Sequence, residues 1–291
     1  MEQRLFSTAA AGADRDLTEL QVRNHHLIRV DVAAVREGHL ILVNRQHPVR
    51  EPVPADKLAD LDAYPAMRAL APGMLLETTA LARLSELLAA CRGTADIVAV
   101  SAYRTAAEQT EIYESSLRDN GPQYTAAYVA WPGCSEHQTG LAVDVGFAGG
   151  GELDFIAPDF PDSGACLDFK RLAAQHGFVQ RYRAGKEALT GIACEPWHFR
   201  YVGAPHAELM ERENLCLEEY IERLRRYSFG GERLAIEDER ERVEIYYVPI
   251  GDGSFIEVPI PDCDYYRLSG DNAGGLIVTA FSGKRRRSLV G

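Results

Sequence analysis

Two short stretches of this chain carry residue types that suit a catalytic metal ion. The first is Ser-Glu-His-Gln-Thr-Gly-Leu-Ala-Val-Asp, which contains His137 and Asp144. The second is Glu-Pro-Trp-His, which contains Glu195 and His198. Two imidazoles and one carboxylate, with a fourth position open to water, are typical of catalytic zinc, whereas structural zinc sites are usually closed and rich in cysteine. We therefore expect His137, Asp144 and His198 to bind one divalent metal.

The chemistry of such a site follows from the charge of the metal. A divalent ion held by two neutral imidazoles and one carboxylate lowers the pKa of a bound water from about 16 toward about 7 and polarises a carbonyl. Glu195 is left over as a general base, three positions before His198. Arg104 is the candidate for stabilising the oxyanion, because its guanidinium stays charged at any working pH. The reaction class that these residues predict is metal-assisted hydrolysis of an amide.

Each of these residues also has a plain structural interpretation. A single buried histidine is more often hydrogen-bonded than metal-bound, and Arg104 could form an ion pair at the start of a helix. The combination of two histidines, a strand aspartate and a spare glutamate favours the metal. Cys134 and Cys194 lie beside the ligands in sequence, and we expect them to pack around the site rather than bind the ion.

The neighbouring sequence predicts the elements that position these side chains. The apolar run at 97–101 predicts a buried strand that ends just before Arg104. Thr105 and Glu108 form a predicted capping box for a helix that extends to about residue 118. The alternation over 141–145 predicts a strand in which Asp144 shares a face with a small alanine.

Pro196 decides whether Glu195 and His198 can reach the same site. In a regular strand, residues three apart point to opposite faces. Proline cannot donate to a strand ladder and forces the residue before it into an extended conformation. We therefore expect a bend at Pro196 that brings both side chains to the metal.

The rest of the chain suggests one main domain and a smaller companion. We expect a polar lead-in over 1–24, a catalytic domain over 25–227 and a β-rich domain with a basic tail over 228–291. The β-rich domain follows from four predicted antiparallel strands between residues 242 and 280, punctuated by Gly and Pro. Within the catalytic domain we also predict short strands at 27–30 and 39–43 and helices at 76–91, 166–176 and 205–227.

Composition sets further limits. The 291 residues carry a net charge of −12, which argues against nucleic acid as the main partner, because phosphate binding needs a basic surface. No stretch is long and apolar enough for a transmembrane helix, and the first twenty residues do not form a secretory signal. The six cysteines are scattered without CxxC pairs, so we expect free thiols and a cytoplasmic protein.

The two metal-ligand stretches, together with Ser-Ala-Tyr-Arg-Thr at 101–105, resemble the zinc D,D-carboxypeptidases of the VanY and VanXY type. The resemblance covers roughly residues 25–227 and rests on an SxHxxGxAxD motif followed by ExxH. It implies an α+β fold with a central antiparallel sheet flanked by helices, shared with Hedgehog signalling domains. It also implies Zn²⁺ as cofactor, Glu195 as catalytic base and Arg104 as the arginine that stabilises the transition state.

The same resemblance adds substrate contacts and a biological role. Ser135 and Gln109 match positions that contact substrate, whereas Cys134 replaces the aromatic residue or histidine that usually precedes the motif serine. The family removes the terminal D-alanine from peptidoglycan precursors ending in D-Ala-D-Ala, and some members also split the free dipeptide. These activities deplete the target of vancomycin. The predicted absence of a membrane anchor resembles the VanXY type.

Other functions remain open at this point. An L,D-carboxypeptidase or a peptidoglycan endopeptidase could use the same scaffold and the same metal. A non-catalytic zinc-bearing binding module could use it too, although the spare Glu195 speaks against that. A serine D,D-peptidase is not expected, because no serine begins an SxxK motif and KTG is absent. HExxH is absent as well.

Overall fold

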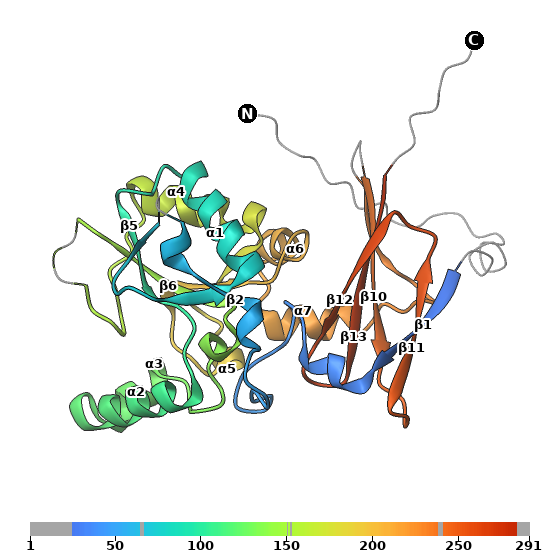
Figure 1. The fold of residues 1–291 in the computed structure, drawn as a ribbon, viewed down its shortest axis with the longest axis horizontal. Helices are drawn as coiled ribbons and strands as arrows, with labels where there is room; N and C mark the ends of the chain where they lie inside the picture. Colours follow the sequence, from blue (N-terminus) through green and yellow to red (C-terminus); the bar gives the residue numbers. More distant parts are fainter. Residues whose placement is uncertain (1–24, 65–66, 150, 152, 238–240, 284–291) are drawn as a thin grey trace, which may run out of the picture. The chain divides into compact units, whose positions relative to one another are not determined.

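A computed structural model describes residues 25–64, 67–149, 151, 153–237 and 241–283. The predicted lead-in over 1–24 and the basic run at 284–287 lie outside these residues. The chain forms two compact units (Figure 1). We call Leu42–Tyr220 the α+β unit, and we call Met1–Ile41 with Ile221–Gly291 the β unit.

The described part of the α+β unit is built on a five-stranded sheet in the order β3-β5-β6-β8-β7. All neighbouring strands are antiparallel except the short β3, which runs parallel to β5. The predicted α+β fold with a central antiparallel sheet is therefore confirmed. The strands are β3 (Arg68–Ala69), β5 (Ile97–Ser101), β6 (Ala142–Phe147), β7 (Phe178–Tyr182) and β8 (Glu195–Tyr201).

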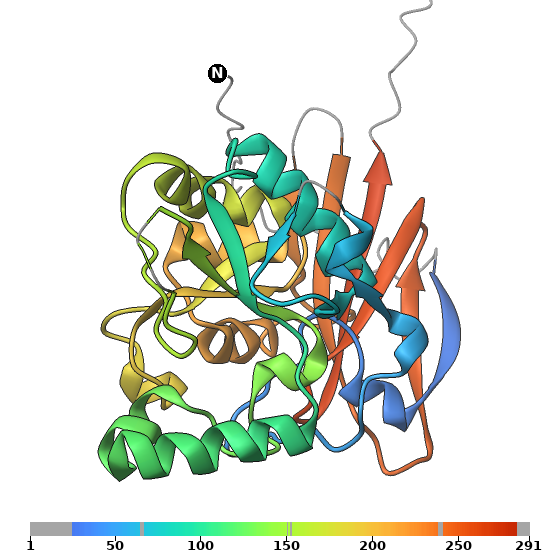
Figure 2. The same ribbon diagram turned by 60° about the vertical axis from the view of Figure 1, so that its left-hand side comes forward.

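Helices α1 (Thr78–Ala90) and α4 (Gly164–Leu172) pack beside each other and cover the sheet (Figures 1 and 2). Helix α1 buries four leucines at the spacing of an amphipathic helix, as predicted. Phe169 of α4 contacts Phe199 of β8 edge to face at 4.8 Å between ring centroids, so the helix packs directly on the strand that carries His198.

Helices α2 (Ala106–Asp119) and α3 (Gly121–Tyr128) lie together on the opposite side of the unit from α1 and α4 (Figures 1 and 2). The predicted capping box of Thr105 and Glu108 begins α2. The remaining elements are η2 (Ala55–Lys57), β2 (Leu58–Asp60), η3 (Leu61–Ala63), β4 (Leu75–Glu77), η4 (Glu136–Thr139), η5 (Ala173–His176), α5 (Glu187–Thr190) and α6 (His206–Glu213), after which α7 (Leu217–Leu224) leads into the β unit.

The β unit contains two sheets within the described residues. Strands β12 (Tyr265–Gly270), β13 (Gly275–Gly283), β10 (Glu241–Pro249) and β9 (Leu234–Glu237) form one sheet in that order. Strand β1 (His25–Asp31), followed by η1 (Val32–Arg36), pairs along its whole length with β11 (Phe255–Pro261). Their core is apolar and includes Val258, Ile260, Leu276 and Val278. The four predicted C-terminal strands are present as β10 to β13.

Three expectations need correction. Residues 39–43 form no strand, because the chain turns after Gly38 and continues without ladder pairing. The predicted helix at 205–227 is two helices, separated where Asn214 adopts a left-handed conformation at φ 51°. The start of the catalytic domain at residue 25 does not match the packing, since β1 pairs with β11 and the α+β unit begins at Leu42.

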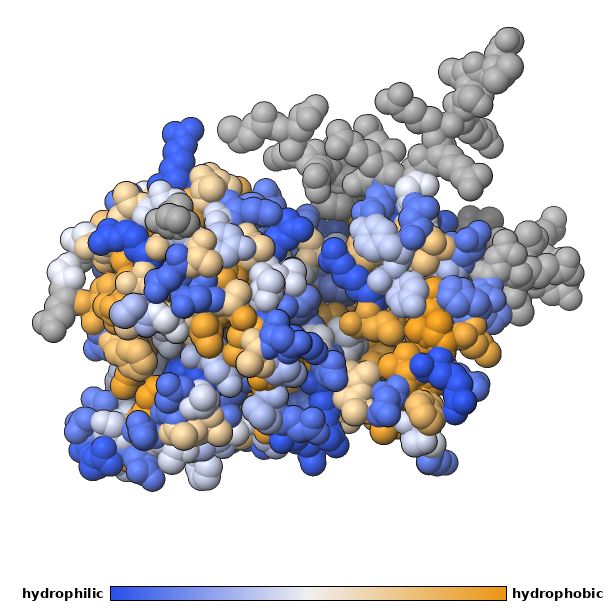
Figure 3. Space-filling model, viewed as in Figure 1, coloured by the Kyte–Doolittle hydropathy of each residue, from blue (hydrophilic) through white to orange (hydrophobic). Residues whose placement is uncertain are grey.

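The described surface mixes polar and hydrophobic side chains on the face shown in Figure 3. The six cysteines all lie in the described residues, and each is a free thiol, as predicted. Within that part of the chain, no helix has both the length and the hydropathy needed to cross a lipid bilayer.

Candidate active site

The first metal-ligand stretch folds as a tight turn followed by a strand. His137 lies on η4, and Gly140 ends this turn in a left-handed conformation at φ 68°, which glycine adopts without steric cost. A Cβ at Gly140 would lie 2.8 Å from a methyl carbon of Leu58. The chain then enters β6, which carries Asp144. The glycine of the motif therefore fixes the path between the two ligands.

The backbone after β5 holds His137 in place. Nδ1 of His137 lies 2.7 Å from the carbonyl oxygen of Ala102, and the amide of Arg104 donates to the carbonyl of His137 at 3.2 Å. A carbonyl only accepts hydrogen bonds, so Nδ1 carries the proton and Nε2 presents its lone pair. Nε2 lies 3.0 Å from Oδ2 of Asp144.

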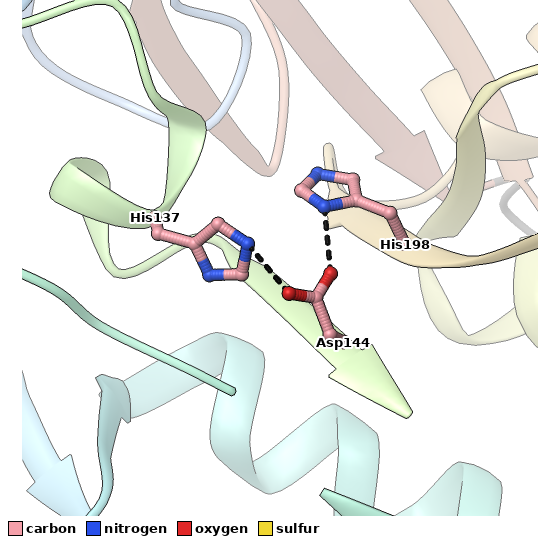
Figure 4. A group of neighbouring side chains, drawn as sticks. All are labelled: His137, Asp144 and His198. Carbon is pink, nitrogen blue, oxygen red and sulfur yellow. Dashed lines mark hydrogen bonds and ion pairs between the residues drawn. The ribbon is translucent and has the colours of Figure 1, made fainter. Parts of the chain in front are cut away.

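His198 reaches the same carboxylate from the neighbouring strand. Asp144 and His198 stand directly opposite each other in the antiparallel pair β6–β8, so their side chains point to the same face. Nδ1 of His198 lies 2.8 Å from Oδ1 of Asp144 (Figure 4). The ligand atoms of His137, Asp144 and His198 all lie within 4.8 Å of one another, and all three residues are buried. The structure thus brings the three predicted ligands together.

Glu195 joins this group through an irregularity in β8. Gln180 pairs with Phe199 and Tyr182 pairs with Glu195, so four steps along β8 oppose two steps along β7. The extra residues change the alternation of β8, as the proline at 196 predicts. Oε2 of Glu195 lies 3.8 Å from Nδ1 of His198.

Arg104 and Gln109 lie on the other side of Asp144. Nη2 of Arg104 lies 3.5 Å from Oδ2 of Asp144, and Nη1 donates to Oε1 of Gln109 at 3.1 Å. The amide nitrogen of Gln109 in turn donates to the carbonyl of Ala130 at 2.8 Å. Both ends of the Gln109 amide are therefore engaged, and one of them orients Arg104. Ser135 is buried and lines the same cavity as Arg104 and Gln109.

Glu136 is a site residue that the motif pattern did not single out. It lies between Ser135 and the ligand His137, is fully buried and places Oε2 3.5 Å from Nε2 of His198. Its Oε1 accepts hydrogen bonds from Arg181 and Arg200, each at 2.8 Å. Both arginines lie in strands that also contain other polar residues, so nothing in the sequence links either of them to Glu136.

Burial and close charges shift the titration of this cluster. Burial alone would raise the pKa of Asp144, but the adjacent imidazoles hold it well below its usual range. Burial, with the charge of Arg104, lowers the pKa of His137 to about 4. Burial alone would lower the pKa of His198, but the Asp144 carboxylate raises it to about 9. Burial raises the pKa of Glu195 to about 8.

The cluster closes one end of a cavity in the α+β unit. Its lining includes the three ligands and Glu195, with Arg104, Gln109 and Ser135 beside them and Tyr128, Tyr182 and Trp197 among the apolar groups. The donor set fits a zinc ion, because two imidazole nitrogens and a carboxylate leave one side facing the cavity. Neither Cys134 nor Cys194 belongs to the ligand group found among the described residues.

Known proteins are similar to this chain in sequence. The family model described as "VanY: D-alanyl-D-alanine carboxypeptidase" matches residues 73–204. The bifunctional D-Ala-D-Ala dipeptidase and D-Ala-D-Ala carboxypeptidase VanXYC of Enterococcus gallinarum is 40% identical over 186 residues, covering 62% of this chain and 92% of that protein. The chain belongs to the VanY family of D-alanyl-D-alanine carboxypeptidases. The predicted resemblance is confirmed.

Solved structures extend the similarity to the fold. The D,D-dipeptidase VanXYg, in complex with a D-Ala-D-Ala phosphinate analog, is 39% identical with a TM-score of 0.82, covering 88% of this chain and 99% of that chain. The L,D-carboxypeptidase LdcB is 31% identical with a TM-score of 0.51, covering 62% of this chain and 84% of that chain.

Proposed function

We propose that this chain is a zinc-dependent D,D-carboxypeptidase that hydrolyses the terminal amide of peptidoglycan precursors ending in D-Ala-D-Ala. The observation that carries the proposal is the convergence of His137, Asp144 and His198 within 4.8 Å, with the Glu195 carboxylate 3.8 Å from His198. A non-catalytic zinc-binding module would need the three ligands but would not need the Glu195 carboxylate. Membership of the VanY family supports the D-Ala-D-Ala amide as the bond that is cleaved.

The ligand residues would hold the zinc through Nε2 of His137, a carboxylate oxygen of Asp144 and Nδ1 of His198. When bound, zinc supplies a water of lowered pKa and polarises the carbonyl of the scissile bond. The second ring nitrogen of each histidine faces an acceptor, Ala102 for His137 and Glu136 for His198. Such partners orient the imidazoles and raise their basicity.

Glu195 is the proposed general base. Its carboxylate takes the proton of the attacking water and passes it to the nitrogen of the departing D-alanine, so that the amide bond breaks and a carboxylate and an amine form. The pKa of about 8 shows that its buried surroundings disfavour charge, and a nearby cation would lower it toward the working range. Glu195 would then transfer this proton within the buried cluster that it forms with the predicted metal ligands.

Arg104 is proposed to donate to the carbonyl oxygen as negative charge develops there. Its guanidinium lines the cavity and is held by Gln109 and Asp144. Preorganised donors of this kind need no rearrangement during the reaction. We propose that Ser135, on the same cavity wall, hydrogen-bonds to the substrate, and that Gln109 acts there together with Arg104.

We further propose that the enzyme cleaves both the free dipeptide and longer precursors, and that it supports resistance to vancomycin-type glycopeptides. The similarity to the bifunctional VanXYC supports dual activity, and the similarity to VanXYg extends over 88% of this chain. Free D-Ala-D-Ala is made inside the cell, so we propose a cytoplasmic location. Cell fractionation with an antibody to the chain tests this.

The decisive experiment compares three substrates with the purified, zinc-loaded protein. We expect D-alanine to be released from D-Ala-D-Ala and from a pentapeptide precursor, but not from the corresponding tetrapeptide, which lacks a D,D bond. Chelation should abolish the release, and zinc should restore it. Full activity in excess chelator, or cleavage of the tetrapeptide alone, would overturn the proposal.

L,D-carboxypeptidase activity is the second candidate, because the L,D-carboxypeptidase LdcB shares 31% identity and the same fold. It keeps the metal and the base but requires the cavity to accept an L residue before the terminal D residue. The tetrapeptide arm of the same experiment separates the two functions.

A further inference from the structure

Two buried polar atoms face each other beside the metal ligands. Nε2 of His198 and Oε2 of Glu136 both lack a hydrogen-bond partner among the described residues. They lie 3.5 Å apart, and both side chains are at least nine-tenths buried. Unpaired buried polar atoms are costly, so such a pair points to a contact that tightens when the site is loaded.

Glu136 is held from behind by two cations. Arg181 donates through Nε and Arg200 through Nη1, both to Oε1 of Glu136 at 2.8 Å. Both guanidiniums are buried, with 1% and 0% of their side chains exposed. Guanidinium groups are donors only, so they require the carboxylate to accept. Glu136 therefore presents its second oxygen to His198 as a fixed acceptor.

The network continues away from the site. The other two nitrogens of Arg181 donate to the two oxygens of Glu218 at 2.9 Å and 2.7 Å. This bidentate pair fixes the plane of the Arg181 guanidinium, because the fork of donors matches the carboxylate. Glu136 cannot move toward or away from His198 without breaking hydrogen bonds that are themselves held in place.

We propose that Glu136 is the positioning residue for the metal ligand His198 in this chain. An acceptor at Nε2 keeps the proton on that nitrogen and leaves the lone pair of Nδ1 directed at the metal position beside Asp144. Glu136 acts through His198, because its Oε1 is held by the two arginines and its Oε2 faces Nε2 of His198. The inference rests on the proposed zinc site.

With zinc bound, the two histidines would therefore take opposite tautomers. His137 donates through Nδ1 to the carbonyl of Ala102 and would bind the metal through Nε2. Nε2 of His198 faces Oε2 of Glu136 at 3.5 Å, would donate to it, and would leave Nδ1 for the metal. The partner of His137 is backbone and tolerates side-chain substitution. The partner of His198 is a side chain, so it can be removed and its effect measured.

The first test measures zinc affinity of the full chain by competition with a chelator. In Glu136→Gln, the amide oxygen is drawn to the two arginines and the amide nitrogen then faces Nε2 of His198, donor against donor. We expect zinc affinity to fall about 10- to 100-fold. Glu218→Gln is the matched control, since it also takes a carboxylate from Arg181 but does not approach His198, and its zinc affinity should stay within about two-fold.

The second test uses histidine side-chain nitrogen NMR on the same proteins. The wild-type zinc protein should show His198 protonated at Nε2 and metal-bound at Nδ1. In the metal-free protein above about pH 9, where this imidazole is neutral, Glu136→Gln should increase the tautomer protonated at Nδ1. Glu136→Asp keeps a negative charge between the arginines but withdraws the second carboxylate oxygen from His198, so its zinc affinity should also fall. This variant replaces Glu136→Gln in the test if the glutamine variant does not fold.

Wild-type affinity and tautomer in both Glu136 variants would overturn the inference. An equal loss in Glu218→Gln would overturn it as well, because the effect would then reflect a loosened network rather than contact with His198. Failure of the wild-type protein to bind zinc contradicts the proposed function itself, and the inference falls with it.

Discussion

Oε2 of Glu195 lies 3.8 Å from Nδ1 of His198, the same nitrogen that lies 2.8 Å from Asp144. The proposed base and one other predicted metal ligand therefore converge on a single imidazole nitrogen of His198. This arrangement requires the irregular pairing of β8, because regular alternation would place Glu195 and His198 on opposite faces of the sheet. The irregular backbone of β8 therefore brings Glu195, the proposed base, close to His198, a predicted ligand.

Replacing Glu195 by glutamine is expected to separate catalysis from metal binding. The amide fills the same space but cannot accept a proton at working pH, so kcat should fall about 10²- to 10⁴-fold. Zinc affinity should change little, because Glu195 is not in the ligand set. Release of D-alanine and chelator competition measure the two quantities on one preparation. The exposed Glu187→Gln is the matched control and should leave both unchanged.

Arg104→Gln is expected to reduce kcat about 10²- to 10³-fold, with KM changing less, because the guanidinium is proposed to donate to charge that develops during the reaction. Arg104→Lys should recover only part of the rate, since a single ammonium cannot reach Asp144, Gln109 and the substrate in one geometry. A loss confined to KM would show instead that Arg104 binds the ground state.

Substitution of Gln109 tests how the Arg104 guanidinium is held in place. Its Oε1 accepts from Arg104 and its Nε2 donates to Ala130, so Gln109→Leu should lower kcat by releasing Arg104. The double variant with Arg104→Gln should then be little worse than Arg104→Gln alone, because residues in one network are not additive. Additive losses would indicate that Gln109 contacts the substrate independently.

The sequence was informative where chemistry restricts the residue type. The grouping of His137, Asp144 and His198 could be inferred, because few combinations of histidine and carboxylate suit a catalytic metal. The capping box of Thr105 and Glu108 and the buried strand at 97–101 also follow local rules that the structure satisfies. The irregular pairing of β8 near Pro196 was predictable because a proline cannot donate to the strand ladder.

The sequence did not predict features that depend on contacts between segments far apart in the chain. Strand β1 pairs with β11 more than 220 residues away, and no local pattern assigns it to the β unit. The break at Asn214 depends on a left-handed conformation, which asparagine adopts more readily than most residues but does not require. Glu136 was missed because its role depends on arginines at 181 and 200, which only the folded sheet brings to it.

Zinc affinity should depend on pH through His198. In the metal-free protein its pKa is raised to about 9, above the ordinary 6.5, so at neutral pH a proton must leave Nδ1 before zinc binds. Between about pH 7 and about pH 9 the apparent affinity should therefore rise by up to about tenfold per pH unit and then level off. Chelator competition across this range and proton release in weakly buffered solution measure it. A flat profile would contradict the raised pKa.

The stability of the metal-free protein should have the opposite pH dependence. His198 and Glu195 both have folded pKa values above their ordinary ones, so at these two groups the folded state binds more protons than the unfolded state between about pH 6.5 and about pH 9. This stabilisation is present at low pH and is lost as pH rises toward about 8 and about 9. The increase in Tm on adding zinc should accordingly be larger at pH 8.5 than at pH 6.5.

A cavity in the β unit should leave the metal site intact. Ile260 is fully buried in the core that β1 and β11 share with β13, so Ile260→Ala should cost about 2–5 kcal/mol of stability in that unit. Leu27 lies in the same strand pair but is 58% exposed, and Leu27→Ala should change stability by less than about 0.5 kcal/mol. None of the ligands, nor Glu136 with its arginines, belongs to the β unit. We therefore expect unchanged zinc affinity at 25 °C in both variants, measured by chelator competition, with a lower Tm only for Ile260→Ala. Weakened zinc binding in Ile260→Ala would show that the two units are energetically coupled and that the metal site depends on both.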